Sequence, residues 1–192
     1  MTEALIKFIE TYPEKFKQLD LTEAYFYMGR VQYNILVSEF TDLMLNNGFN
    51  PLLYMPEVPN GYLKGSQYTG NETLIIPNNI RTIKRLAFEG SLFKTVIIKE
   101  GCEVIQGLAF KQMPNLESVY LPKSLIRLGM TLFIRCKNIK TIYYPGTREE
   151  FENIEGATPD DEYDWYKTAV GRIEDKCILI CKDQTIELGI PG

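Results

Sequence analysis

Apolar and polar positions alternate in short runs that recur along the middle of the chain. The runs read TLII, TVII, SVYL and TIYY, and they begin at Thr73, Thr95, Ser118 and Thr141. Their last residues stand at positions 76, 98, 121 and 144, so they are 22, 23 and 23 residues apart. A fixed period of this length is typical of a solenoid, in which each unit buries its apolar edge against the next. The pattern predicts a stack of short parallel strands.

Alternate residues of a strand point to opposite faces of a sheet, so each run has an inner and an outer set. We expect the following strand residues to point into the core: Leu74, Ile76, Val96, Ile98, Val119, Leu121, Ile142 and Tyr144. A second inner ladder follows each strand at the same period: Ile80, Ile83, Cys102, Ile105, Leu125 and Leu128. A stack of phenylalanines at the same period is expected to fill the far corner: Phe88, Phe110 and Phe133.

The outer set forms two predicted columns along the stack. The first column is apolar and aromatic, and it consists of Ile75, Ile97, Tyr120 and Tyr143. The second column carries hydroxyl groups, on Thr73, Thr95, Ser118 and Thr141. One interpretation is a protein-docking surface made by the first column with Thr95, Ser118 and Thr141 beside it, because tyrosine offers contact area at low entropic cost. The other is that the N-terminal part of the chain covers this face as ordinary core.

The first 48 residues read as a helical N-terminal module. Thr22 begins a long predicted helix that ends at Asn46, Asn47 and Gly48. Its apolar residues are spread over the whole circumference, so it needs cover on more than one side. We therefore expect a protein contact here, with a second copy in a homodimer or with a foreign partner, at Phe26, Tyr33 and Phe40.

Two further segments flank the predicted solenoid of residues 72–154. Residues 49–71 read as an ordered connector on the first coil, with apolar anchors at Leu52, Leu53, Tyr54, Met55 and Tyr62. Residues 155–192 read as a capping segment. Just before it, Thr147 and Glu150 predict a capping box for a short helix. Within it, KCILIC and TIEL predict a terminal β-hairpin that closes the open end of the stack. The predicted fold class is α+β.

The units resemble the BspA-like leucine-rich repeat family. The resemblance rests on IIPNNIRTIKRLAF and YLPKSLIRLG, and on the closing YYPGTREEFENI, DWYK and CILICKDQTIEL, over residues 72 to 188. Lys99 departs from the family's proline, Lys84 and Gln106 from the glycine that Gly129 retains, and Gln184 from a turn glycine. The resemblance implies an interaction scaffold without shared catalysis. Short members without a signal sequence and with a helical N-terminal module are similar to bacteriophage-encoded proteins, which implies a phage factor.

Composition restricts the chemistry that we expect. The chain has no histidine, which removes the commonest acid–base group and metal ligand. Its four cysteines stand in apolar runs and read as core residues, and their spacing does not fit a zinc site. No phosphate loop, nucleophile elbow or dinucleotide fingerprint occurs. We expect no enzyme, no cofactor and no metal. The N-terminus lacks a secretory pattern and no run is long enough to span a membrane, so we expect a cytoplasmic protein.

Charge is distributed unevenly and leaves three function classes open. Residues 65–146 carry a net charge of +6, while residues 1–64 carry −3 and residues 147–192 carry −7. The leading hypothesis is a protein-binding module that blocks or redirects a host protein. A structural component of a virion or another assembly is the second. A nucleic-acid-binding protein that stacks bases on tyrosines is the third, and the overall acidity of the chain weighs against it.

Overall fold

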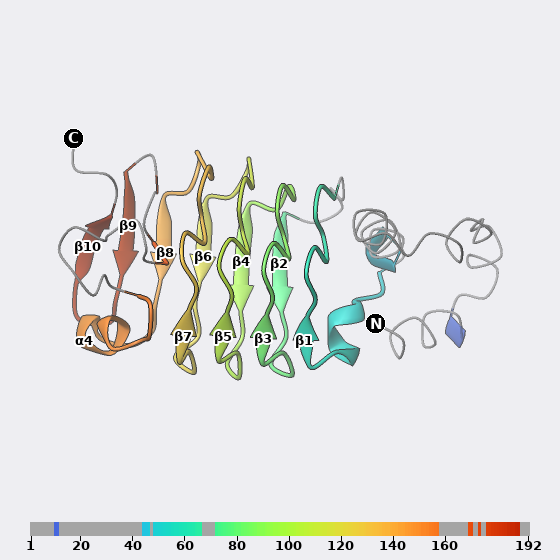
Figure 1. Cartoon of the computed structure of the whole chain (residues 1–192), viewed down its shortest axis with the longest axis horizontal. Helices are drawn as coiled ribbons and strands as arrows, with labels where there is room; N and C mark the ends of the chain where they lie inside the picture. Colours follow the sequence, from blue (N-terminus) through green and yellow to red (C-terminus); the bar gives the residue numbers. More distant parts are fainter. Residues whose placement is uncertain are drawn as a thin grey trace.

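The computed structural model describes residues 10–11, 44–46, 48–66, 72–157, 169–170, 173 and 176–188. Its central part is a β-solenoid whose coils stack side by side along one axis (Figure 1). The predicted helical module of residues 1–48 lies almost wholly outside the described residues, which show helical backbone only at positions 10–11 and 44–46 of that segment. Phe26, Tyr33 and Phe40 also lie outside them.

Strands of the described coils form two sheets, because each coil contributes one strand to each side of the solenoid (Figure 1). The long sheet has the order β10-β9-β8-β6-β4-β2, with β2 at Thr73–Ile76, β4 at Thr95–Ile98, β6 at Ser118–Tyr120, β8 at Thr141–Tyr143, β9 at Cys177–Ile180 and β10 at Thr185–Leu188. The short sheet has the order β1-β3-β5-β7, with β1 at Glu57–Val58, β3 at Thr82–Ile83, β5 at Val104–Ile105 and β7 at Arg127–Leu128.

All strands from β1 to β8 pair in parallel, and their register matches the sequence period. Ile75 pairs with Ile97, Ile97 with Tyr120, and Tyr120 with Tyr143. The inner residues predicted from alternation are all buried, from Leu74 at 5% exposure to Tyr144 at 4%. The second ladder is buried as well, since it lines the inner side of the short sheet. The solenoid and its two inner ladders are therefore confirmed.

The predicted phenylalanine stack fills one corner of the solenoid. Phe88 and Phe110 stack with ring centroids 5.5 Å apart, and Phe110 and Phe133 with centroids 5.6 Å apart. Each of these three rings is at most 1% exposed. Tyr62 extends the cluster with an edge-on contact to Phe88. Stacking equivalent residues of successive coils removes each ring from water on both faces, which makes this corner the densest aromatic part of the core.

The chain turns sharply on either side of each phenylalanine by adopting left-handed backbone. One set of equivalent positions before the ring has positive φ: Gly61, Leu86, Leu108 and Thr131. A second set after the ring also has positive φ: Gly65, Gly90, Gln112 and Arg135. Glycine adopts this conformation without steric cost, whereas the other residues are strained in it. The corner is therefore a repeated backbone feature that packing imposes on several unfavourable side chains.

Residues 48–66 form most of an additional first coil. The 3-10 helix η1 (Pro51–Tyr54) stands where the other coils have a strand of the long sheet, and Asn50 caps it by accepting from the Leu52 N–H. The Asn79 amide of the next coil donates to the Leu52 and Met55 carbonyl oxygens and holds η1 in place. Leu52, Met55 and Tyr62 are buried as expected. The expectation that Leu53 is an anchor is wrong, since it is 56% exposed.

The far end of the stack is closed by the predicted helix and hairpin. Helix α4 (Arg148–Glu152) has the expected capping box between Thr147 and Glu150. Strands β9 and β10 form the expected antiparallel hairpin, and β9 adds to β8 in parallel, so the hairpin extends the long sheet. Beside the short sheet, the N–H of Leu128 donates to the Glu155 carbonyl oxygen, which covers the edge of β7.

Candidate functional site

The outer face of the long sheet carries the continuous surface that alternation predicts. Its first column, called here the outer column, consists of Ile75, Ile97, Tyr120 and Tyr143 in register on four parallel strands. Ile75 is 44% and Tyr120 39% exposed, while Ile97 and Tyr143 are half-buried between their neighbours. The second column, called the hydroxyl column, consists of Thr73, Thr95, Ser118 and Thr141, all half-buried. The structure thus brings all seven of the predicted solenoid site residues together on one open face.

Two tyrosines form the centre of the exposed surface. The rings of Tyr120 and Tyr143 stack with centroids 4.4 Å apart and an angle of 7° between their planes. Burial and the nearby Tyr143 hydroxyl raise the pKa of Tyr120, so it keeps its proton at neutral pH. The pair therefore presents ring edges and two neutral hydroxyl groups to the solvent.

The terminal hairpin lengthens both columns beyond the residues that we expected. In the register of β8 and β9, Tyr143 pairs with Ile180, and Thr141 pairs with Ile178. Both isoleucines are half-buried on the outer face, while Cys177 and Leu179 point into the core. The alternation in CILIC could have revealed these residues. What it could not show was that the hairpin joins the sheet next to β8 and continues the face.

A row of charges borders the hydroxyl column at the amino ends of the strands. It consists of Glu72, Lys94, Glu117 and Lys140, called here the charged rim. The Lys94 ammonium lies 3.5 Å from the Glu72 carboxylate, and the Lys140 ammonium lies 2.9 Å from the Glu117 carboxylate. The hydrogen bond from Lys140 lowers the pKa of Glu117, with a smaller contribution from Lys94. The rim alternates in sign along the stack and is neutral overall.

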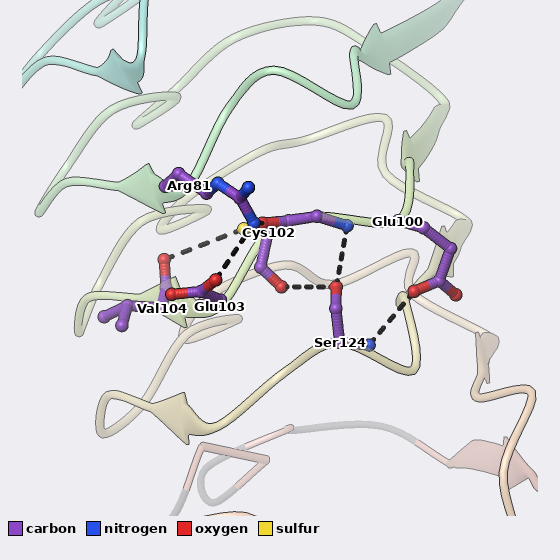
Figure 2. Close-up of polar contacts among 7 residues, drawn as sticks. Arg81, Glu100, Cys102, Glu103, Val104 and Ser124 are labelled. Carbon is purple, nitrogen blue, oxygen red and sulfur yellow. Dashed lines mark hydrogen bonds and ion pairs between the residues drawn. The ribbon is translucent and has the colours of Figure 1, made fainter.

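A polar cluster between two coils looks chemically promising but is structural. The Glu100 carboxylate accepts hydrogen bonds from the backbone N–H groups of Lys123 and Ser124 (Figure 2). The Ser124 hydroxyl in turn donates to the Cys102 carbonyl oxygen and accepts from the Gly101 N–H (Figure 2). Burial raises the pKa of Cys102 to about 12, so its thiol is neither ionised nor accessible at neutral pH. The cluster satisfies backbone groups where two coils meet.

A cavity of about 250 Å³ lies at the N-terminal end of the long sheet, next to the outer column. Most of its lining is apolar and comes from η1 and its flanks, from β2 and from Phe93. Ile75 and Leu74 form its wall on the side of β2. It fits an apolar side chain better than a polar ligand, because few polar groups line it.

The described part of the chain contains no group of three or more histidine, cysteine, aspartate or glutamate side chains placed to hold a metal ion. All four cysteines are buried thiols, and Cys136 donates to the Phe110 carbonyl oxygen at 2.9 Å. Among the described residues, no helix is both long and apolar enough to cross a membrane. The predicted contact residues Phe26, Tyr33 and Phe40 lie outside the described part.

One comparison with known proteins identifies the repeat. Residues 66–155 match the family model of the BspA type Leucine rich repeat region, in six copies. No curated protein and no solved structure matches the chain.

Proposed function

Because the repeat array of this chain belongs to the BspA-type leucine-rich repeat family, we propose that the protein is a non-enzymatic protein-binding module. Its binding surface in this proposal is the outer face of the long sheet, with the outer column at its centre and the hydroxyl column beside it. Solenoids of stacked repeats present extended surfaces of this kind, because successive units place equivalent side chains in line. The family implies protein interaction in general, and the geometry of this chain supports the particular face.

The observation that carries the proposal is the exposed apolar and aromatic column on a rigid sheet. Ile75 and Tyr120 are 44% and 39% exposed, although the repeat period has a buried position next to each of them. The side chains are held in register by the strand pairing, so little conformational entropy is lost when a partner binds. Tyrosine is enriched among the residues that dominate protein–protein binding energy.

The same geometry favours a protein partner over single-stranded nucleic acid. Bases bind tyrosine by stacking on a ring face. One face of Tyr120 is covered by Tyr143 at a centroid distance of 4.4 Å, and Ile97 lies on the neighbouring strand at the other side. Tyr143 has Ile180 as its neighbour on β9. The rings therefore offer edges and hydroxyl groups, which suit the side chains of a folded protein surface.

The test compares capture of partners by the wild-type chain and by Tyr120→Ala and Tyr143→Ala, followed by calorimetry with the purified partner. Each change should weaken binding by about 2 kcal/mol or more. Ile126→Ala is the matched control, because Ile126 is 61% exposed next to the short sheet and lies outside the proposed surface. Normal binding by both tyrosine variants would exclude this face as the site.

The identity of the partner follows from the hypotheses that the sequence raised. We propose a host protein as the partner if the chain is encoded by a phage, with Phe26, Tyr33 and Phe40 as a second contact region. Incorporation into purified particles would instead support the structural-component hypothesis. A steep loss of binding with salt would support the nucleic-acid hypothesis, because binding to phosphates releases counterions.

A further inference from the structure

The charged rim and the outer column change character when they are followed in the opposite direction along the stack. From β2 to β8 the rim alternates in the order Glu72, Lys94, Glu117 and Lys140, so the reverse order begins with a lysine. The outer column starts with two isoleucines and ends with two tyrosines. Each acid thus corresponds to a base, and each isoleucine to a tyrosine, when one copy of the face is reversed against another.

A twofold axis produces this reversal if it runs parallel to the strands and passes between β4 and β6. It keeps the strand direction and inverts the stacking direction, so β2 faces β8 of the second copy and β4 faces β6. Two sheets packed face to face keep their strands nearly aligned, as this arrangement requires. Resting on the proposed function, we propose that the partner of this face is a second copy of the chain, bound about this axis.

Every row of the face has a suitable counterpart in this dimer. Ile75 lies over Tyr143 of the second copy, and Ile97 over Tyr120, so aliphatic groups cover the ring edges. The hydroxyl column faces its own copy, where threonine and serine hydroxyls can donate to and accept from one another. At the rim, Glu72 meets Lys140 and Lys94 meets Glu117. A twofold interface uses the same patch on both copies, and this patch is complementary to itself.

The rim side chains are accessible for these contacts. The side chains at the two ends of the rim are the most exposed, with Glu72 at 75% and Lys140 at 67%. Lys94 and Glu117 are 45% and 37% exposed. Each already pairs within its own chain, so dimerisation would convert two separate ion pairs into networks of four charges across the interface. Charge complementarity of this kind mainly determines which surfaces meet and in which orientation.

The size of the face predicts a weak dimer. Strands lie about 4.8 Å apart and rise about 3.3 Å per residue, so the strands from β2 to β9 present roughly 300 Å² per copy. Two such faces bury less than the roughly 1,200 Å² at which stable interfaces begin, which places the dimer in the transient class. We expect self-association that rises with concentration between about 10 µM and 1 mM.

The decisive experiment mixes two charge-reversal variants of the full chain. Glu72→Lys alone places lysine opposite Lys140, and Lys140→Glu alone places glutamate opposite Glu72, so sedimentation velocity should find each variant monomeric. An equimolar mixture restores every rim contact between unlike copies and should form a heterodimer at least as readily as the wild type. Arg81→Glu is the control, because Arg81 pairs with Glu103 next to the short sheet and its reversal should leave the dimer unchanged.

Two results would overturn the proposal. One is a wild-type monomer over the whole concentration range, and the other is a wild-type dimer that the single reversals leave intact or that the mixture fails to restore. Circular dichroism should show native folding of both variants, since the rim lies outside the core. Neither result affects the proposed function, which fails only if Tyr120→Ala and Tyr143→Ala bind a foreign partner normally.

Discussion

The rings of Tyr120 and Tyr143 stack at a centroid distance of 4.4 Å on the solvent side of the long sheet, while Phe110 stacks on Phe133 at 5.6 Å inside the solenoid. Both contacts arise from the same repeat period, because parallel pairing places equivalent residues of successive coils side by side. They differ in burial: Tyr120 is 39% exposed and Phe110 is fully buried. Stability and binding should therefore depend on different stacks.

Truncation of the outer stack should have little effect on the fold. Tyr120→Ala removes one exposed aromatic contact and leaves no enclosed cavity, so we expect a loss of about 1 kcal/mol in the free energy of unfolding. Urea denaturation followed by circular dichroism measures this loss. A loss above about 3 kcal/mol would show that the tyrosines belong to the core and would remove them as specific probes of binding.

Truncation of the inner stack should be severe. Phe110→Ala removes a ring that contacts Phe88 on one side and Phe133 on the other, and the rigid coils cannot collapse into the space. The expected loss is about 3–5 kcal/mol, because both the buried area and the packing of two neighbouring rings are lost. The same urea experiment checks it. A loss below about 1 kcal/mol would contradict the role of Phe110 at the centre of the stack.

The part of the fold that sequence predicts well is the part that repeats. Leu74, Val96, Val119 and Ile142 could be assigned to the inner face because strand alternation and the period of 22 to 23 residues agree at each of them. The first coil escaped this reasoning, since η1 replaces the strand and the spacing changes. Pairing between β8 and β9 also could not be foreseen, because the intervening segment breaks the period.

The glycine at position 129 is required by contact between coils. A Cβ atom on Gly129 would lie 2.0 Å from the Gly107 backbone nitrogen and 2.6 Å from Gly107 Cα, and neither backbone atom can move without shifting a coil. We expect Gly129→Ala to cost about 3 kcal/mol in the free energy of unfolding. This contact explains why position 129 keeps glycine while the equivalent positions carry Lys84 and Gln106.

Gly65→Ala is the control for this substitution. Gly65 has a φ of +68°, but a Cβ atom at this position would have no neighbouring atom within 4 Å, so only the backbone conformation opposes the change. It should cost about 1–2 kcal/mol. Equal losses for the two variants would contradict the contact between coils as the cause.

Left-handed corners predict a stabilising substitution. Arg135 has a φ of +62° and is exposed, whereas Gly90 occupies the equivalent position of an earlier coil with a φ of +72°. Arg135→Gly removes the strain of a side chain in left-handed backbone and adds some entropy to the unfolded chain. We expect a net gain of about 0.5–1 kcal/mol, measured as a higher urea midpoint. The reverse change, Gly90→Ala, should lower the midpoint.

The candidate site was predictable where it follows the strands and unpredictable elsewhere. Ile75 and Tyr120 were identified as exposed because alternation alone decides which face a strand residue takes. The rim pairing of Lys140 with Glu117 depends on which residues of successive coils become neighbours, which follows from the register rather than from spacing within one unit. The left-handed residues Leu86 and Thr131 carry no sequence signal, since neither residue type favours that conformation.

Buried thiols should make the protein less stable in alkaline solution. Burial raises the pKa of Cys102 and of Cys177 to about 12, from an ordinary value of 9.0. A thiol with a raised pKa stays protonated in the folded state while the unfolded chain ionises. Its stabilising contribution is therefore complete below about pH 9 and is lost as the pH rises toward 12. Each thiol should lower the free energy of unfolding by up to about 1.4 kcal/mol per pH unit in this window.

Urea denaturation of the wild type, Cys102→Ala and Cys177→Ala between pH 8 and about pH 11 checks this slope. Each variant loses some stability at every pH, because alanine leaves a small cavity in the core. The informative quantity is consequently the dependence on pH, which should be shallower in each variant than in the wild type. Slopes that are equal in all three proteins would contradict a buried neutral thiol at these two positions, because a solvent-accessible thiol ionises alike in the folded and unfolded chains.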